Sequence, residues 1–216
     1  SVVGLSVLFD QNDRVIRTEV QITVDKNRRP DQTTQAEITL YSKGPVVRSV
    51  ATADDQRPQE PVGYRMEDYR TPTPATLAGA RVVDTQAAFG VWRDKAAIFV
   101  DVLPQAPKPA NLPASTVWRD KRRDNIPGGV WLADVGYGAL SPQTEAYFRK
   151  GLDKASAGDK RRPLLFYCLA DCWMSWNAAR RALEFGYINV LWYPEGTDGW
   201  SAAGHPLAEQ RPEPRD

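Results

Sequence analysis

Three features are scarce in this sequence, and each scarcity excludes a class of protein. The 216 residues include one histidine and two cysteines, which together fall short of the four ligands of a structural zinc site. No apolar run approaches the roughly 20 residues that span a bilayer, so we predict no membrane span. The formal net charge is +1, which provides no overall field to attract nucleic acid. A globular protein of ordinary hydrophobic and charged content remains.

Charged and terminal features add little to this conclusion. The basic runs Arg119–Arg123 and Lys160–Arg162 each contain or follow an aspartate, and we interpret both as solvated faces rather than nucleic-acid patches. His205 stands between a glycine and a proline near the end of the chain, where we expect an exposed surface residue. The chain opens at Ser1 without a signal peptide, as in a processed mature protein, a fragment or a trimmed form.

The composition divides the chain into four parts. Residues 1–43 are rich in Val, Ile and Thr and predict a small antiparallel β meander, with strands at 2–9, 15–24 and 36–41. Residues 44–76 are proline-rich and polar, which is typical of a linker or of a strap on the next domain. The main domain is expected over 77–208, and the last residues, 209–216, are expected to form a tail.

The main domain alternates short apolar runs with helical patterns. Several runs are apolar on both faces, as buried parallel strands are, and the runs cover Arg81–Asp84, Ala96–Val102, Val130–Asp134, Leu164–Cys168 and Ile188–Tyr193. Helices are predicted over Thr85–Trp92, from the Ser141 cap onward, and over Trp173–Phe185. This order predicts an α/β fold with a parallel sheet flanked by helices on right-handed crossovers.

One predicted strand ends in a thiol, Cys168, and a helix begins about five residues later. Ligands of open α/β sheets bind at the carboxyl ends of the strands, and a helix N-terminus favours an anion. We therefore predict a depressed pKa and raised reactivity for Cys168. Cys172 lies in the same loop, within disulfide reach if the loop curls. Because so short a loop gains little stability from a crosslink, a reactive pair explains both thiols better than a structural staple.

Other cysteine chemistries were weighed against the same residues. An inert buried cysteine would account for Cys168 but not for a second thiol beside it. Covalent haem attachment needs a histidine directly after the second cysteine, where Trp173 stands. A soft metal ion held by two thiolates stays open, and a catalytic Cys–His pair would require His205 to fold back onto the loop.

Several neighbours are candidates for the helix start and the pocket. Trp173 and Trp176 begin the helix beside the thiols, where they could fill the core or form an apolar wall that stacks on a planar ligand. Asp171, between the cysteines, is expected to cap the helix, or else to raise the pKa of a thiol. Ser175 lies on the inner face of the predicted helix, and Arg180 is spaced to pair with a glutamate one turn later.

Four segments, taken in order, resemble a rhodanese domain. They are a strand that ends in aspartate, an IPGA-like turn, the strand that delivers the catalytic cysteine and a closing glycine-rich segment: Ile98–Val102, Asn125–Val130, Phe166–Cys168 and Gly186–Trp200. The resemblance implies a rhodanese-like sheet over 77–208, sulfurtransferase-like chemistry, and a pocket that includes Asp101.

The cysteine loop resembles a narrower group. Residues 168–179 read Cys-Leu-Ala-Asp-Cys-Trp-Met-Ser-Trp-Asn-Ala-Ala and are similar to the CXXCW-motif proteins associated with PQQ-dependent alcohol catabolism, as are residues 61–70. This resemblance implies a periplasmic protein that serves quinoprotein alcohol oxidation, with a quinoprotein dehydrogenase or a cytochrome c as partner. The association with PQQ is indirect, so no bound cofactor and no metal ligand is predicted.

The loop also departs from ordinary rhodaneses, whose cysteine is followed by an arginine and a glycine. Here an acid replaces the base, which disfavours the dianion thiosulfate. In one hypothesis Cys168 is the nucleophile and Cys172 the resolving partner of thiol-redox or sulfur-handling chemistry. In another the loop belongs to a non-catalytic binding module for a quinone cofactor, a metal ion or a partner protein. A third is an interaction domain with a permanent disulfide.

Overall fold

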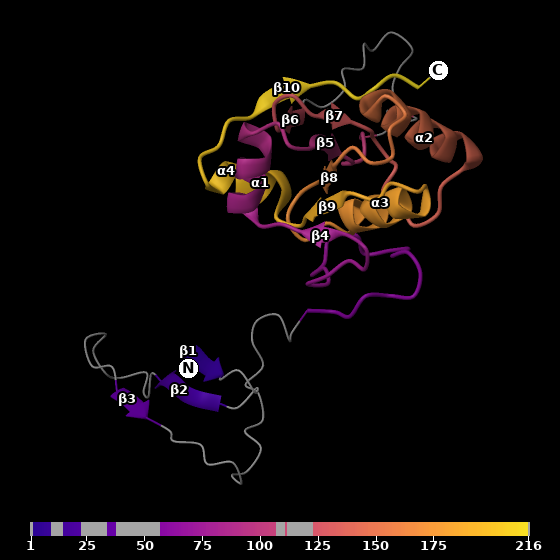
Figure 1. The fold of residues 1–216 in the computed structure, drawn as a ribbon. Coiled ribbons are helices and arrows are strands. Elements are labelled where there is room, and N and C mark those ends of the chain that lie inside the picture. Colours follow the sequence, from indigo (N-terminus) through magenta and orange to yellow (C-terminus); the bar gives the residue numbers. More distant parts are fainter. Residues whose placement is uncertain are drawn as a thin grey trace. The chain divides into compact units, whose positions relative to one another are not determined.

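The structure is a computed structural model that describes residues 2–9, 15–22, 34–37, 57–106, 111 and 123–215. The chain forms two units, residues 1–50 and 51–216. No helix within the described residues is long and apolar enough to cross a bilayer. The two units are shown in Figure 1.

The first unit is a three-stranded antiparallel sheet in the order β1-β2-β3, as the alternating pattern predicts. Its strands are β1 (Val2–Phe9), β2 (Val15–Ile22) and β3 (Thr34–Glu37). The third strand begins two residues earlier than expected, and the rest of the expected strand lies outside the described residues.

The second unit is built on a five-stranded sheet in the order β4-β9-β8-β5-β7, in which every pairing is parallel. The strands are β4 (Arg81–Val82), β5 (Ile98–Asp101), β7 (Val130–Trp131), β8 (Leu164–Tyr167) and β9 (Val190–Tyr193). The interior strands β8 and β9 are buried on both faces, which explains why their sequences are continuously apolar.

Helices cover both faces of this sheet (Figure 1). They are α1 (Thr85–Arg93), α2 (Pro142–Ser156), α3 (Trp173–Glu184) and α4 (Gly196–Ala202). The sheet separates two hydrophobic cores, one on each face, and alternate residues of β8 point into them. Phe166 packs with α2 and α3, whereas Leu165 packs with α1 and α4. The parallel sheet flanked by helices confirms the predicted fold class and is consistent with a rhodanese-like fold.

Local signals located the two longest helices well. The Ser141 side chain accepts a hydrogen bond from the Thr144 N–H and Pro142 occupies the first turn, so α2 begins where the sequence predicts. Three elements were not predicted: α4 and the antiparallel pair β6 (Arg123–Asn125) and β10 (Ala208–Gln210). The two strands are short and polar, so they lack the apolar alternation that marks a strand.

Residues at both ends of the second unit pack against it. Residues 57–76, here called the strap, lie along α3, where the Arg180 guanidinium donates to three successive strap carbonyls, those of residues 61–63. At the other end the Glu213 N–H donates to the Trp131 carbonyl, and Arg215 pairs with Asp134 at 2.6 Å. The described part of the proline-rich segment is therefore a strap on the α/β domain rather than a free linker.

Candidate functional site

Two buried thiols meet where β8 ends and α3 begins. Cys168 directly follows β8, and Cys172 is the N-cap residue of α3. Their sulfur atoms lie 2.7 Å apart, and the side chains are only 0% and 2% exposed. The loop curls as the disulfide argument requires, so the structure brings together the two residues that the sequence singles out.

The curl of the loop depends on Asp171, which has a left-handed backbone with φ of 48°. Aspartate tolerates this conformation better than most residues. The turn corrects one prediction: Asp171 does not cap α3, because it lies one residue before the N-cap and no side chain caps the helix. The N-cap position belongs to Cys172, and the Asp171 side chain is exposed to solvent.

The pKa values of the two thiols run opposite to the prediction. Burial, and then the nearby Cys172, raises the pKa of Cys168 well above its ordinary value, so the expected depression at Cys168 is wrong. A hydrogen bond from the Cys168 thiol, helped by the N–H groups of Met174 and Leu169 and by the charge of Arg70, lowers the pKa of Cys172 to about 7. The thiolate therefore belongs at the helix N-terminus, on Cys172.

Two further N–H groups of the loop are used within the protein. The Ala170 N–H donates to the Asp198 carboxylate at 3.0 Å, and the Trp173 N–H donates to the Tyr69 carbonyl at 2.9 Å. These groups cannot also hold an incoming dianion. The geometry therefore agrees with the sequence argument against thiosulfate as a substrate.

A buried ion pair supports the loop from below. Asp101, at the end of β5, is fully buried, and its carboxylate accepts a hydrogen bond from Arg123 at 2.8 Å. Burial raises the pKa of Asp101, an effect that the Arg123 charge opposes. The same guanidinium donates to the Cys168 carbonyl at 3.3 Å and to Thr197 at 3.1 Å. Asp101 thus acts on the loop through Arg123.

Arg123 was missed by sequence reasoning, which placed it in a solvated basic run. The prediction is wrong for this residue because β6 turns it inward, beneath the cysteine loop. Residues 119–122 of the run lie outside the described residues. Nothing in the run distinguishes Arg123 from its neighbours, so no sequence signal would have found it.

The tryptophans beside the thiols are covered rather than open. Trp173 and Trp176 pack edge to face at 5.5 Å, and their ring N–H groups donate to strap residues Thr71 and Thr76. Ser175 donates to the Cys172 carbonyl at 3.0 Å and holds the α3 start in place. These contacts make the aromatic pair part of the core and an anchor for the strap, and leave no free wall for a planar ligand.

Two other predicted residues lie away from the sulfur atoms. Arg180 pairs with Glu184 as the spacing predicts, with 3.4 Å between charged atoms, although it mainly holds the strap. The His205 ring stacks on Phe89 at 4.0 Å and packs against Trp200 of α4, so it is half-buried instead of exposed and forms no pair with a thiol. Among the described residues no three metal-ligating side chains gather.

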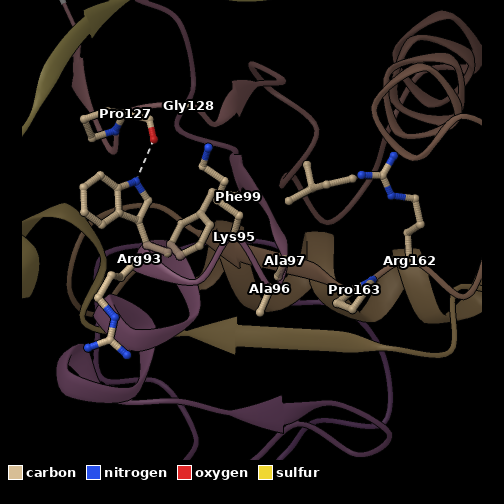
Figure 2. Close-up of a pocket in the computed structure, with 11 residues that line it drawn as sticks. Arg93, Lys95, Ala96, Ala97, Phe99, Pro127, Gly128, Arg162 and Pro163 are labelled. Atoms are coloured by element: carbon tan, nitrogen blue, oxygen red, sulfur yellow. Dashed lines mark hydrogen bonds between the residues drawn. The ribbon is translucent and has the colours of Figure 1, made fainter.

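A cavity of about 630 Å³ borders the loop at the carboxyl ends of the strands, with Leu169, Arg123 and Thr197 in its lining. Another, of about 700 Å³, lies at the amino ends, where Lys95 and Arg162 stand on opposite sides (Figure 2). No candidate site residue lines the second cavity. Cavity volume therefore does not locate the reactive groups of this protein.

No protein-family model matches the chain, and no curated protein matches it. Similar solved structures include an uncharacterized protein from Saccharomyces cerevisiae, at 22% identity and a TM-score of 0.37, with 58% of this chain and 93% of that chain covered. A polysulfide-sulfur transferase from Wolinella succinogenes is 16% identical, with coverage of 62% and 81% and a TM-score of 0.39. EanB, in complex with hercynine, is 21% identical with a TM-score of 0.42, and the match takes in 66% of this chain and 34% of EanB.

Proposed function

We propose that this chain is a thiol-redox protein of rhodanese-like fold, in which Cys172 and Cys168 cycle between dithiol and disulfide. The observation that carries the proposal is the 2.7 Å approach of two sulfur atoms at a helix N-terminus. A disulfide here would close a very short loop and add little stability, so a purely structural role is a poor explanation for the pair.

The opposite pKa shifts assign the two roles. The Cys172 thiolate attacks a disulfide, forms a mixed disulfide and releases the first thiolate. Cys168 then attacks the Cys172 sulfur and releases the second thiolate, which takes up the Cys168 proton. The protein pair has lost two electrons and the substrate has gained them. A thiol reductant restores the dithiol by the reverse exchange.

Trapping of the mixed disulfide tests this assignment. Cys168→Ser removes the resolving thiol, so a mixed disulfide with a small aromatic disulfide should accumulate on Cys172 and be detected by intact mass. Cys172→Ser should form at least about tenfold less adduct, since the remaining thiol has a raised pKa. Preferential adduct on Cys168 would reverse the roles, and absence of adduct in both variants would refute thiol exchange.

The biological setting of the proposal comes from the resemblance of residues 168–179 to the CXXCW-motif group. We place the chain in the periplasm, in support of PQQ-dependent alcohol oxidation, with a quinoprotein dehydrogenase or a cytochrome c as partner. Thiol trapping in intact cells of the source organism tests this setting. The redox state of the pair should shift when growth changes to an alcohol, and a pair that stays unchanged would contradict it.

The burial of both sulfur atoms favours a second candidate function, a binding module without turnover. In that case the loop holds a metal ion or a partner protein rather than a stacked quinone, and the thiols only shape the site. Cys172→Ser would then weaken binding of that ligand, and no covalent adduct would form in the trapping experiment. Measurement of the reduction potential of the native cysteine pair separates the two functions. A thiol-redox pair is oxidised and reduced reversibly, whereas the cysteines of a binding module are not.

A further inference from the structure

The middle of the strap packs against the start of α3, beside the buried thiol pair. The Tyr69 carbonyl accepts the Trp173 N–H at 2.9 Å, and the Thr71 hydroxyl accepts the Trp173 ring N–H at 3.1 Å. A strap carbonyl thus takes one of the N–H groups in the first turn of α3, beside Cys172. Tyr69 also packs against the buried cluster that contains Cys168 and Cys172, so this contact lies beside the thiol pair.

The strap also reaches the other side of the loop. Arg70 pairs with Asp198 of α4 at 3.9 Å, and the same Asp198 carboxylate accepts the Ala170 N–H from within the cysteine loop. The strap segment Tyr69–Thr71 therefore bridges α3, which follows the cysteine loop, and α4, which carries Asp198. The charge of Arg70 lowers the pKa of Cys172, so the bridge lies within electrostatic reach of that thiol.

We propose that strap residues 66–72 form a lid over the Cys168–Cys172 pair, closed by the Arg70–Asp198 latch and by the contacts to Trp173. The lid governs access to the dithiol, and it rests on the proposed function in that it regulates the thiol exchange described above.

The Arg70–Asp198 latch is the weakest contact of the lid, and stronger contacts anchor the strap on either side of the lid. Before it, buried Asn177 bonds both backbone groups of Arg65, and Arg180 holds three further carbonyls. After it, Trp176 donates to the Thr76 carbonyl. Within it, the latch joins side chains that are 55% and 51% exposed, and a pair so exposed is weak and screened by salt.

Two further features affect the equilibrium between an open and a closed lid. The Tyr69 hydroxyl accepts the Gly138 N–H at 3.1 Å, which favours closure. Just after the lid, the hydroxyl of Thr73 is buried and has no hydrogen-bond partner among the described residues, which carries a free-energy cost in the closed state. Removal of the exposed latch should therefore shift the balance toward the open lid.

Alkylation of Cys172 in the Cys168→Ser background measures the lid directly. Iodoacetamide forms a carbon–sulfur bond and releases iodide, and mass spectrometry follows the product. The reaction is run at about pH 9.5, where the thiol is ionised even if loss of a nearby cation raises its pKa. Asp198→Asn removes the latch charge yet keeps an oxygen for the Ala170 N–H, and Arg70→Gln removes the other half.

Both latch variants should be alkylated about fivefold or more faster than the parent, and the Trp173 amide should exchange its hydrogen faster in both. Val62→Ala is the control, because that strap side chain is 98% exposed and should leave both rates unchanged. Equal rates in the parent and the latch variants would overturn the lid. So would alkylation that keeps pace with exchange of the β8 amides, since the thiols would then open only by global unfolding.

The test separates the lid from the proposed function. Alkylation requires only access to a thiolate, whereas the mixed-disulfide experiment requires exchange with a second sulfur. A chain whose latch variants react faster but which never traps a mixed disulfide would keep the lid and lose the thiol-redox function. A chain that traps a mixed disulfide but whose latch variants react no faster than the parent would keep the thiol-redox function and lose the lid.

Discussion

The two ends of the parallel sheet differ in where they place polar groups. At the amino ends, the cavity of Figure 2 has an apolar wall that includes Phe99 and cations such as Lys95 that stay exposed to water. At the carboxyl ends, the Asp101–Arg123 ion pair and two thiols are buried almost completely. Both ends border cavities of similar size, yet it is at the carboxyl ends that burial raises the pKa of Asp101 and of Cys168.

The difference shows what makes a site reactive in this fold. An ionisable group that remains in water interacts weakly with neighbouring charges, because solvent and salt screen it. The same group in the interior depends on specific partners, and its pKa moves with them. The carboxyl ends bury such groups because β5 and β8 both finish there and α3 begins there. Chemistry is therefore expected at that end alone.

The largest expected effect comes from breaking the buried ion pair. Arg123→Ala leaves the fully buried Asp101 without its partner, which should lower the free energy of unfolding by about 3–5 kcal/mol. Urea denaturation measures the loss. Arg93→Ala removes the cation of an exposed pair at the amino end and should cause no measurable change. Equal losses of unfolding free energy in the two variants would show that burial of the Asp101–Arg123 pair does not stabilise the fold more than an exposed pair does.

The next effect sharpens the contrast within the thiol pair. Cys168→Ala removes the main hydrogen-bond donor to Cys172, so the pKa of Cys172 should rise from about 7 toward the ordinary value of a cysteine. The thiolate fraction at neutral pH then falls roughly tenfold. Cys168→Ser keeps a donor and should preserve most of the lowered pKa. The pH dependence of iodoacetamide alkylation gives both values, and identical profiles would show that the helix N-terminus sets the pKa unaided.

The smallest effect is expected at the amino ends. The Trp92 ring N–H donates to the Pro127 carbonyl at 2.8 Å, a bond drawn in Figure 2. Trp92→Phe removes that bond and should cost about 0.5–1.5 kcal/mol of unfolding free energy. The alkylation rate of Cys172 should stay the same, because β5 and β8 separate the two ends. A changed rate would show that the ends are coupled.

Sequence reasoning succeeded where the signal is local. The Ser141 cap followed by proline marked the start of α2, and the apolar run that ends at Cys168 marked β8 and its thiol. It also placed Cys172 within reach of Cys168, since a loop of this length has few ways to separate them. Each of these features depends on residues that are neighbours along the chain.

It failed where the partner lies far away in the sequence. Asp171 looked like a helix cap, but the loop takes a left-handed residue at that point and moves the cap to Cys172. Arg123 looked solvated, but its partner Asp101 lies on β5, on the far side of a segment outside the described residues. The pKa order of the thiols was wrong because burial at Cys168 outweighs the helix N-terminus.

The amino-acid order by itself determined the α/β architecture, the strand that carries Cys168 and the closeness of the second thiol, because periodicity, caps and short spacing act over a few residues. Only the tertiary structure decided which sulfur holds the negative charge, which arginine supports the loop and what covers it. Those outcomes depend on burial and on contacts such as Trp173 with Tyr69, between residues about a hundred positions apart, and no local pattern encodes them.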